Sequence, residues 1–497
     1  MDVLRQVALL LQQENDRLHS RIECLTRELA AAKGVGTEQL QFELENLRAL
    51  LSRREQEIFG DSSEKRKHDC SGAAKRNEGA TPSGHGRTAQ PRLAIVEEIH
   101  ELDEADRVCP ACGGGLTEMK GQFEESEEVT VVERHFILKK HLRQKYRCQC
   151  QGHVETALGP TKLQEGSRYS PEFAVEVAAS KYLDHLPLER QVRIMAREGL
   201  QVTSQTLYDQ IEVMARCLRP TYEAILAEVL ASPVVGADET HWRLMGQKDE
   251  NKRWWVWSVV SPSAVFFRIL DSRSEKSAEK VLSPYKGVVM ADGYKVYDAL
   301  SRGDPDLVLA NCWAHVRRKF VEIEDNFPLP CRQMIDLIGE LYAVERSVRE
   351  TVRNGDEAAY LAALSEARRS RSQPLLDQIR QWTSEQRCLP ESGLGTAIRY
   401  MLGLWKGLTH FADDPRIPLD NNSVERALRA VVVGRKNHYG SRSRRGTEVA
   451  ALFYTLIETA KLRGVEPKAY LRRAILAALH APGTITLPQP DSAAQAA

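Results

Sequence analysis

Three carboxylates in this chain stand where they could meet at one edge of a sheet. Asp238 follows a short run of small and β-branched residues, and Asp292 ends a similar run later in the chain. Both runs have the composition of short buried strands, which places the two acids at strand ends. Glu425 comes much later, where a helix is expected to begin. Converging carboxylates of this kind can hold Mg²⁺ or Mn²⁺, and two such ions activate the attacking oxygen and stabilise the leaving oxygen of a phosphodiester.

Each acid also has a simpler interpretation. Asp238 could merely end its strand, and Asp292 with Gly293 has the form of a turn pair. Glu425 has the spacing of a capping box behind Asn422. Taken together, however, two strand-end acids and one helix acid are the arrangement that divalent cations need. The sequence therefore predicts that Asp238, Asp292 and Glu425 are both catalytic residues and metal ligands.

Basic residues near these acids in the sequence predict contacts with DNA phosphates. The densest basic segment of the chain follows Glu425, with glycines and an aromatic residue interleaved. A second basic group opens the helix expected after the last strand. Contacts of this kind make binding strongly dependent on salt. The candidate DNA-binding residues are Arg435, Lys436, Arg442, Arg444 and Arg445 in the first group, and Arg317, Arg318 and Lys319 in the second.

The segments around the first two acids predict an α/β core. Five runs of aromatic and β-branched residues indicate strands, acids end the first and the fourth, and one short helix lies between the third and the fourth. This order fits a ribonuclease-H-like fold. The expected strands end at Asp238 and Asp292 or span 253–260, 264–270 and 307–311, and the helix spans 274–282.

The catalytic core is expected to span residues 233–463 and to carry an insertion. Residues 328–410 have a wholly helical pattern, and the gap between Asp292 and Glu425 is too long for a single connection. We therefore expect an all-helical insertion there. The residues that follow the core are expected to form a C-terminal helix at 464–482 and a disordered tail at 483–497.

The residues before the core predict a helical region at 165–232. One helix begins at Pro187 and ends at Gly199, and Thr203 caps the next. Two helices joined by a short turn that contains glycine have helix-turn-helix spacing, which favours DNA binding. An ordinary helical hairpin has the same pattern and remains the alternative.

Two pairs of cysteines predict a structural zinc site in a small module at 93–158. The first pair is separated by two residues and followed by glycines, as in a zinc knuckle, and the second pair completes a tetrahedral set. The second pair is closer in sequence than is usual, and His153 could replace one of its members. The stretches 130–138 and 140–147 between the pairs are expected to form strands of a ribbon, and a redox pair or plain core cysteines are the alternatives. The candidate zinc ligands are Cys109, Cys112, Cys148 and Cys150.

The N-terminal residues predict a coiled coil that joins copies of the chain. Leucines recur every seven residues from Leu4 to Leu25, and Asn15 occupies one of the intervening core positions. A single asparagine of this kind selects register and two-stranded pairing. We expect a leucine zipper over 1–59 that forms a homodimer or a larger oligomer, with an amphipathic helix lying on its own domain as the alternative. Residues 60–92 are rich in Ser, Gly, Lys, Arg and Pro and predict a disordered linker.

The composition limits the class of protein. The chain has 497 residues, with 69 basic and 69 acidic side chains, so its net charge neither favours nor excludes a nucleic-acid partner. No apolar run approaches the length of a membrane span, and the N-terminus has no signal-peptide core. The remaining cysteines are scattered, as free thiols of a reducing compartment are. We expect a cytoplasmic protein.

These motifs together resemble the transposases of the insertion-sequence sixty-six family, which are of the aspartate–aspartate–glutamate (DDE) type. The resemblance covers nearly the full length of the chain. Besides the zipper and the first cysteine pair, it rests on the stretches 181–191 (KYLDHLPLERQ), 237–240 (ADET), 291–294 (ADGY), 315–320 (HVRRKF), 421–429 (NNSVERALR), 434–437 (GRKN) and 469–471 (AYL).

The resemblance implies a function. Asp238, Asp292 and Glu425 would be the acidic triad of an enzyme that cuts DNA at the ends of a bacterial insertion sequence and joins the freed 3′-hydroxyls to target DNA, with Mg²⁺ as cofactor. It implies double-stranded DNA as partner, small accessory proteins of the same element, and a nucleoid-associated location. A nuclease of the same fold that never joins strands, or a catalytically inactive DNA-binding remnant, are the alternatives. The zipper argues against the first and the intact triad against the second.

Overall fold

The computed structural model describes residues 153–245, 253–352 and 356–489, together with 135–147 and scattered positions between 97 and 149. By its internal contacts the chain divides into two compact units, one of residues 1–64 and 136–497 and one of residues 65–135. The expected coiled coil at 1–59, the linker at 60–92 and the four candidate zinc cysteines lie outside the described residues.

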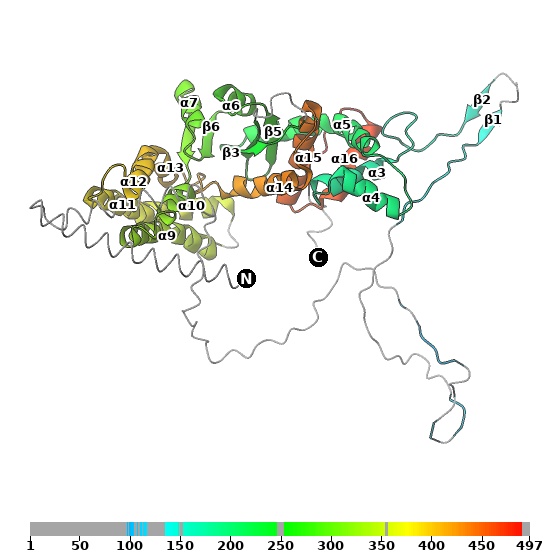
Figure 1. The fold of residues 1–497 in the computed structure, drawn as a ribbon, viewed down its shortest axis with the longest axis horizontal. Coiled ribbons are helices and arrows are strands. Elements are labelled where there is room, and N and C mark those ends of the chain that lie inside the picture. Colours follow the sequence, from blue (N-terminus) through cyan, green and yellow to red (C-terminus); the bar gives the residue numbers. More distant parts are fainter. Residues whose placement is uncertain are drawn as a thin grey trace, which may run out of the picture. The chain divides into compact units, whose positions relative to one another are not determined.

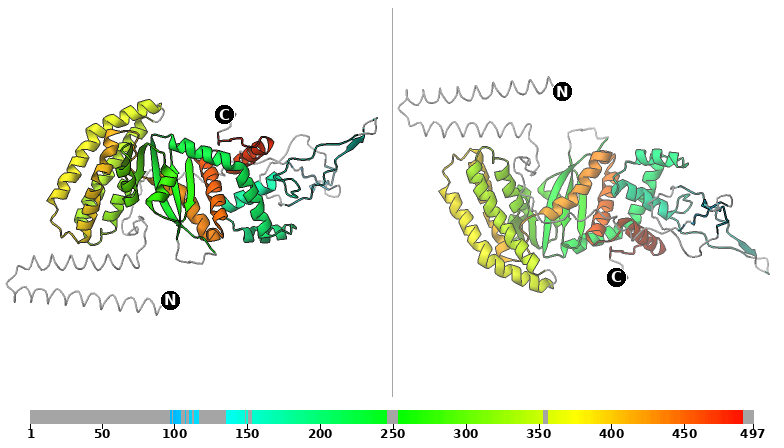
Figure 2. Two further views of the ribbon diagram at one scale, coloured as in Figure 1. Left: turned by 90° about the horizontal axis from the view of Figure 1, so that it is seen from above. Right: turned by 90° about the horizontal axis from the view of Figure 1, so that it is seen from below.

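A five-stranded mixed sheet forms the centre of the larger unit (Figures 1 and 2). Its strand order is β5-β4-β3-β6-β7, with β3, β4 and β5 antiparallel and β3, β6 and β7 parallel. The five expected strands are therefore all present. They span Val234–Trp242 (β3), Trp254–Val260 (β4), Val265–Leu270 (β5), Gly287–Ala291 (β6) and Leu307–Asn311 (β7).

The first strand is longer than expected. The sequence predicted that it ends at Asp238, but β3 continues to Trp242. Its first part pairs with β6, whereas the part from Gly236 onward pairs with β4, up to Trp242 opposite Trp254. The polar residues after Asp238 resemble a strand end in the sequence, but pairing with β4 satisfies their backbone groups.

Each parallel connection of the sheet contains a helix, as the geometry of parallel strands requires. The expected helix α6 spans Glu275–Leu282 and joins β5 to β6. A second helix, α7 at Lys295–Gly303, joins β6 to β7 and was not predicted. Tyr297 is its one buried residue, so its apolar pattern is too weak to be recognised in the sequence.

The edge of the sheet at β5 is covered by a helix that supplies hydroxyl groups. Helix α15 (Arg444–Leu462) lies along β5. The hydroxyl of Thr455 accepts from the backbone N–H of Phe267 at 2.9 Å, and that of Thr459 accepts from Val265 at 3.1 Å. These side chains take the place of a sixth strand, so the edge cannot pair with another chain.

Helices before and after the sheet share its hydrophobic core. The hydroxyl of Tyr222 in α5 donates to the carbonyl of Phe267 in β5 at 2.8 Å, and the helices pack with the sheet in one continuous core. The expected helix pair corresponds to α4 and α5, but α5 is 27 residues long and buries much of its length. These helices are α3 (Pro171–Tyr182), α4 (Leu188–Arg197), α5 (Ser204–Leu230) and α16 (Pro467–His480).

A second hydrophobic core lies beyond β7, where the helices from α8 to α13 gather on one side (Figure 2). The buried guanidinium of Arg368 ties them together, because it pairs with Glu345 at 2.7 Å and donates to the carbonyl of Phe411 at 2.7 Å. Arg368 begins a π-helical turn, Arg368–Ser372. The helices are α8 (Trp313–Val321), α9 (Pro328–Thr351), α10 (Glu357–Ala367), α11 (Gln373–Glu385), α12 (Gly393–Gly403) and α13 (Trp405–Asp413).

The ribbon expected between the cysteine pairs differs from the prediction. A short hairpin pairs β1 (Lys145–Arg147) with β2 (Val154–Thr156), but residues 135–144 form no strand. Alternation of apolar and polar residues there is not matched by a buried face, since Ile137, Leu138 and Leu142 are exposed.

No helix in the described part of the chain is both long and apolar enough to cross a bilayer.

Candidate active site

Asp238 and Asp292 lie side by side where the parallel pairing of β3 with β6 ends. The last paired residues of the two strands are Gly236 and Met290. Asp238 comes two residues after Gly236, and Asp292 comes two residues after Met290. Asp292 directly follows Ala291, the last residue of β6, and its charge contributes to the raised pKa of Asp238, so the two carboxylates lie close together. The structure therefore brings together two of the three predicted acids.

Backbone amides hold both carboxylates in place. Asp238 accepts through Oδ1 from the N–H of Glu239 at 2.7 Å, and Asp292 accepts through Oδ1 from the N–H of Tyr294 at 3.0 Å. The turn interpretation of Asp292 is thus correct as far as it goes, because this is an Asx turn. It is compatible with a catalytic role, since it orients the carboxylate.

The helix that carries Glu425 packs directly on β3 because of a glycine. Helix α14 spans Asn422–His438. A Cβ added at Gly236 would lie 2.4 Å from Val424 and 2.5 Å from the amide oxygen of Asn421, so only glycine allows this approach. The side-chain amide of Asn421 also donates to the carbonyl of Ala237 at 2.9 Å. The N-cap is Asn421, and it makes no capping bond, so the capping-box interpretation of Glu425 is wrong.

Burial and crowding of negative charge raise the pKa of Asp238 to about 7. Burial is the main cause, and the charges of Glu239, Asp292 and Glu425 act in the same direction. Neighbouring carboxylates that disfavour a further negative charge form a site that attracts a cation, and their hard oxygen donors suit Mg²⁺. The carboxylate oxygens of Asp238 and Asp292 are thus of the kind that the predicted ion prefers.

Two basic side chains from α8 reach Glu425. His315 Nε2 and an Arg318 guanidinium nitrogen each lie 3.6 Å from Glu425 Oε1. Burial and then the charge of Arg318 lower the pKa of His315, while Asp292 and Glu425 oppose the shift. Among the described residues, no group of three or more His, Cys, Asp or Glu side chains is close enough together to hold a metal ion. The carboxylate of Glu425 faces α8 instead of the two aspartates.

Comparison with known proteins gives the context of this site. Residues 166–449, which contain all three acids, match the family described as Transposase IS66 family. This chain belongs to the IS66 transposase family. The resemblance predicted from the motifs is thereby confirmed.

A second match covers residues 106–151 and is described as the zinc-finger binding domain of transposase IS66. It contains all four predicted zinc cysteines. His153, the alternative ligand, lies just outside it, and its Nε2 is 2.9 Å from Glu155.

Two proteins of Sinorhizobium fredii (strain NBRC 101917 / NGR234) are similar to this chain. Uncharacterized protein y4jD is 32% identical over 400 residues, which cover 77% of this chain and 75% of the relative. Uncharacterized protein y4hP is 27% identical over 487 residues, which cover 91% and 84% respectively.

Glu239, the residue after Asp238, is a buried acid that was not predicted to belong to the site. The side chain of Glu239 is fully buried and accepts from Arg273 Nε at 2.6 Å and from the hydroxyl of Tyr297 at 2.7 Å. The Arg273 guanidinium stacks on Tyr294, 3.7 Å from the ring centroid, and the N–H of Tyr294 holds Asp292. The network thus connects the interior of the sheet to Asp292. The sequence did contain a sign of this acid, because Glu239 directly follows Asp238. Side chains alternate along a strand, so that of Glu239 lies on the face of the sheet opposite to that of Asp238.

Some of the predicted DNA-binding residues are exposed to solvent, whereas others pair with groups of the protein itself. Arg435 links α14 to β3, because its guanidinium donates to the hydroxyl of Thr240 at 2.9 Å and to the carbonyl of His241. Lys436 and Arg442 are exposed. The others contact the protein itself. Arg445 lies 2.6 Å from Glu212, and Arg444 lies 3.8 Å from Glu448. In α8, Lys319 lies 3.0 Å from Glu322, Arg318 faces Glu425, and Arg317 also contacts other residues of the protein.

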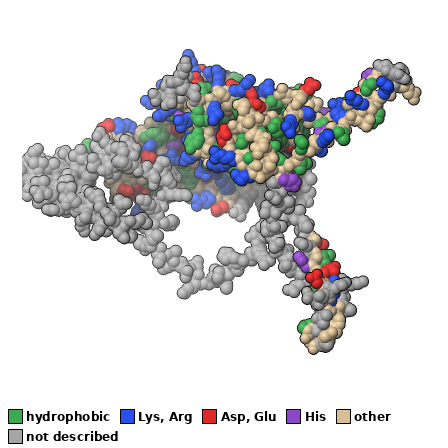
Figure 3. All heavy atoms as spheres, turned by 45° about the vertical axis from the view of Figure 1, so that its right-hand side comes forward, with side chains coloured by type: hydrophobic (Ala, Val, Ile, Leu, Met, Phe, Trp, Pro, Cys, Tyr) green, Lys and Arg blue, Asp and Glu red, His purple; other side chains and the backbone are tan. Residues whose placement is uncertain are grey.

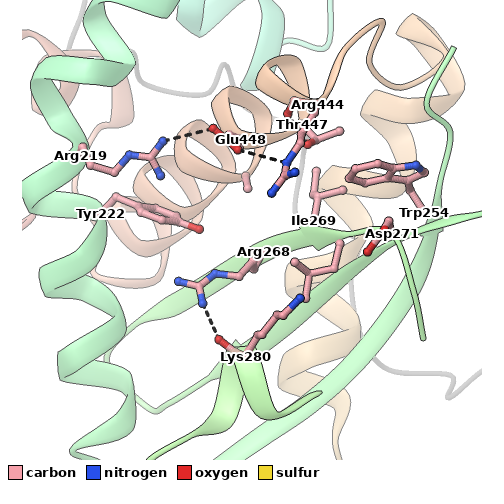
Figure 4. A pocket seen from close by; sticks show the side chains of 12 residues that line it. Arg219, Tyr222, Trp254, Arg268, Ile269, Asp271, Lys280, Arg444, Thr447 and Glu448 are labelled. Carbon is pink, nitrogen blue, oxygen red and sulfur yellow. Dashed lines mark hydrogen bonds and ion pairs between the residues drawn. The ribbon is translucent and has the colours of Figure 1, made fainter. Parts of the chain in front are cut away.

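Basic side chains are spread over the face in Figure 3 rather than gathered in one patch. A cavity of about 530 Å³ lies between α5, α15 and β5 (Figure 4). Arg219 and Arg444 in its wall both face Glu448. None of the three predicted acids lines it, so it is separate from the active site.

Proposed function

We propose that the chain is a DDE transposase that cleaves DNA at the ends of its insertion sequence and transfers the 3′-hydroxyl ends to target DNA. The observation that supports the proposal is the closeness of Asp238 in β3 to Asp292, which directly follows the neighbouring parallel strand β6. Glu425 lies on the helix that packs against β3. The sheet supports a ribonuclease-H-like core, because three antiparallel strands are followed by two parallel ones on the other side of the first.

The three acids would hold Mg²⁺, with Mn²⁺ as a substitute. Divalent ions in such a site supply an activated attacking oxygen and stabilise the leaving oxygen. The chain's own residues orient the carboxylates, through the backbone amides after Asp238 and Asp292. Arg318 lies 3.6 Å from Glu425 and would be placed to pair with a DNA phosphate if Glu425 held the ion.

The proposed partners follow from the same function. Double-stranded DNA is bound both as element end and as target, and Lys436 and Arg442 remain proposed phosphate contacts because they are exposed. Pairing of two element ends by one complex would use the proposed coiled coil at 1–59. Small accessory proteins of the same element are proposed further partners.

Strand transfer separates a transposase from a nuclease of the same fold. The purified protein is incubated with Mg²⁺, a labelled duplex that carries the parent element's end, and a supercoiled target plasmid. We expect cutting at the element boundary and label joined covalently to the plasmid, and neither product with Asp292→Asn. Cutting without joined product would favour the nuclease, and cutting by Asp292→Asn at the normal rate would contradict the assignment of the acids.

We propose that Cys109, Cys112, Cys148 and Cys150 hold a structural zinc ion. Thiolates in a tetrahedral set bind zinc tightly enough to fold a small module. We therefore expect one equivalent of zinc in the freshly purified protein by atomic absorption. A chelator should make residues 93–158 sensitive to protease while the unfolding temperature of the sheet domain stays unchanged. Protein that is protected to the same extent without any zinc would refute this site.

A further inference from the structure

Tyr439 has a backbone conformation that a tyrosine rarely adopts. It follows helix α14 with φ of 59° and ψ of 17°, in the left-handed region. Helices often end in this conformation, but with glycine, because a side chain at Cβ crowds the backbone there. A bulky residue in this region is an outlier that calls for a reason.

The ring of Tyr439 supplies no packing that would explain the outlier. The residue is 63% exposed to solvent. Its backbone N–H donates to the carbonyl of Arg435 at 2.9 Å, a bond that any residue could make. The structure therefore places a large aromatic ring in solvent at a position where glycine would fit better.

The residues on either side of Tyr439 are anchored, so the ring is held in a defined place. His438 is buried, with Nε2 3.1 Å from the hydroxyl of Tyr454. A Cβ added at Gly440 would lie 2.0 Å from the carbonyl oxygen of Arg243, and the N–H of Ser441 donates to that same oxygen at 3.0 Å. The turn is thus pinned to the end of β3 and cannot carry the ring away.

Basic residues flank Tyr439 in the chain and lie near the end of β3 to which its turn is pinned. Lys436 is one helical turn before Tyr439 and Arg442 follows it, and both are exposed. At the end of β3, to which the turn is pinned, the charges of Arg435, Arg253 and Arg243 all lower the pKa of His241, after burial as the first cause. No Asp or Glu occurs between residues 434 and 445.

We propose that Tyr439 is a stacking platform for an unpaired base of the DNA that enters the active site. An exposed aromatic ring among phosphate-binding cations is the means by which proteins hold single-stranded nucleic acid without reading its sequence. The inference rests on the proposed function.

The length of α14 separates Tyr439 from Glu425. It lies at the far end of α14 from Glu425, about 20 Å away at 1.5 Å per residue. That length corresponds to roughly six steps of 3.4 Å along a DNA strand. Tyr439 would therefore contact an unpaired base a few nucleotides from the cleaved phosphate, and it would not contact the reacting atoms.

The test compares two substitutions on two DNA probes. Tyr439→Gly removes the ring and relieves the backbone, so its unfolding temperature should equal or exceed that of the wild type. Tyr439→Phe keeps the ring and removes only the hydroxyl. The probes are a fully paired duplex and the same duplex with one unpaired 2-aminopurine near its end, and binding is measured without Mg²⁺ by anisotropy and by quenching of the 2-aminopurine.

We expect Tyr439→Gly to bind the probe with the unpaired base roughly ten-fold more weakly, to lose the quenching, and to bind the paired duplex as the wild type does. Tyr439→Phe should behave as the wild type on both probes. Lys436→Ala is the matched control, because loss of a phosphate contact should weaken both probes equally.

Other outcomes overturn the inference. Unchanged binding by Tyr439→Gly would exclude stacking, and equal losses in Tyr439→Phe and Tyr439→Gly would assign the contact to the hydroxyl. A changed sedimentation coefficient of Tyr439→Gly with unchanged DNA affinity would assign the ring to a protein interface. If the wild type binds neither probe, the proposed function itself fails, and this inference with it.

Discussion

Replacing Asp238 by asparagine is expected to abolish Mg²⁺-dependent cleavage while making the metal-free protein more stable. Loss of one of the two neighbouring carboxylates, of Asp238 in β3 and of Asp292 just after β6, should lower the cleavage rate roughly a thousand-fold or more, because the developing charge is no longer stabilised. Asparagine keeps the oxygen that accepts from the N–H of Glu239, so the local structure should persist. Cleavage of a labelled element end measures the first effect.

The gain in stability has a definite pH dependence. Folding raises the pKa of Asp238 from 3.8 to about 7, so the charged form is disfavoured in the folded protein. The free energy of unfolding of the wild type therefore falls as pH rises from about 4 to about 7, by roughly 2–4 kcal/mol from this group. Because Asp238→Asn removes the charge, it should raise the unfolding temperature at pH 8 and leave it unchanged near pH 4.

Mg²⁺ provides the control for this prediction. The ion should raise the unfolding temperature of the wild type at pH 8, where Asp238 is charged, and should have little effect on Asp238→Asn. Equal stabilisation of both proteins by Mg²⁺ would show that Asp238 is not a ligand. Lower stability of Asp238→Asn at pH 8 would show that its charge is not crowded in the folded state.

Replacing Arg273 by methionine is expected to destabilise the sheet domain by about 2–4 kcal/mol. The substitution leaves the fully buried carboxylate of Glu239 with Tyr297 as its remaining partner, and a buried unpaired charge is costly. Arg273 is partly exposed, which places the effect at the lower end for a broken buried pair. Thermal or denaturant unfolding measures it.

A matched ion pair on the same sheet domain provides the control. Lys286 and Asp306 also form an ion pair, but both side chains are mostly exposed, so Lys286→Met should leave stability almost unchanged. The double variant Glu239→Gln with Arg273→Met should recover much of the loss, because the buried charge is then absent. A loss for Arg273→Met no larger than for Lys286→Met would mean that the buried pair adds nothing.

Several parts of the site could be predicted from local sequence alone. The runs that lead into Asp238 and Asp292 have a composition typical of buried strands, and both runs form strands of the sheet. Recognition of the family from its motifs was correct as well. These features depend on neighbours in the chain, and for that reason a pattern of a few residues contains them.

Other parts depend on residues that are distant in the sequence. Glu239 pairs with Arg273, 34 positions away, and with Tyr297, 58 positions away. Arg435 looked like a DNA contact within its basic segment, but it ties α14 to the end of β3, 195 positions earlier. No local pattern reports such pairs, because they form only when the sheet brings their strands and helices together.

The sequence by itself therefore determined which strands form and which acids follow their apolar runs. Only the tertiary structure decided how those elements meet: that Gly236 lets α14 approach β3, that Glu425 faces His315 and Arg318, and that Tyr439 is held out in solvent. The physical reason is range. Strand and helix formation depends on hydrophobic periodicity within a segment, whereas close packing and buried ion pairs depend on side chains that only the complete fold brings into contact.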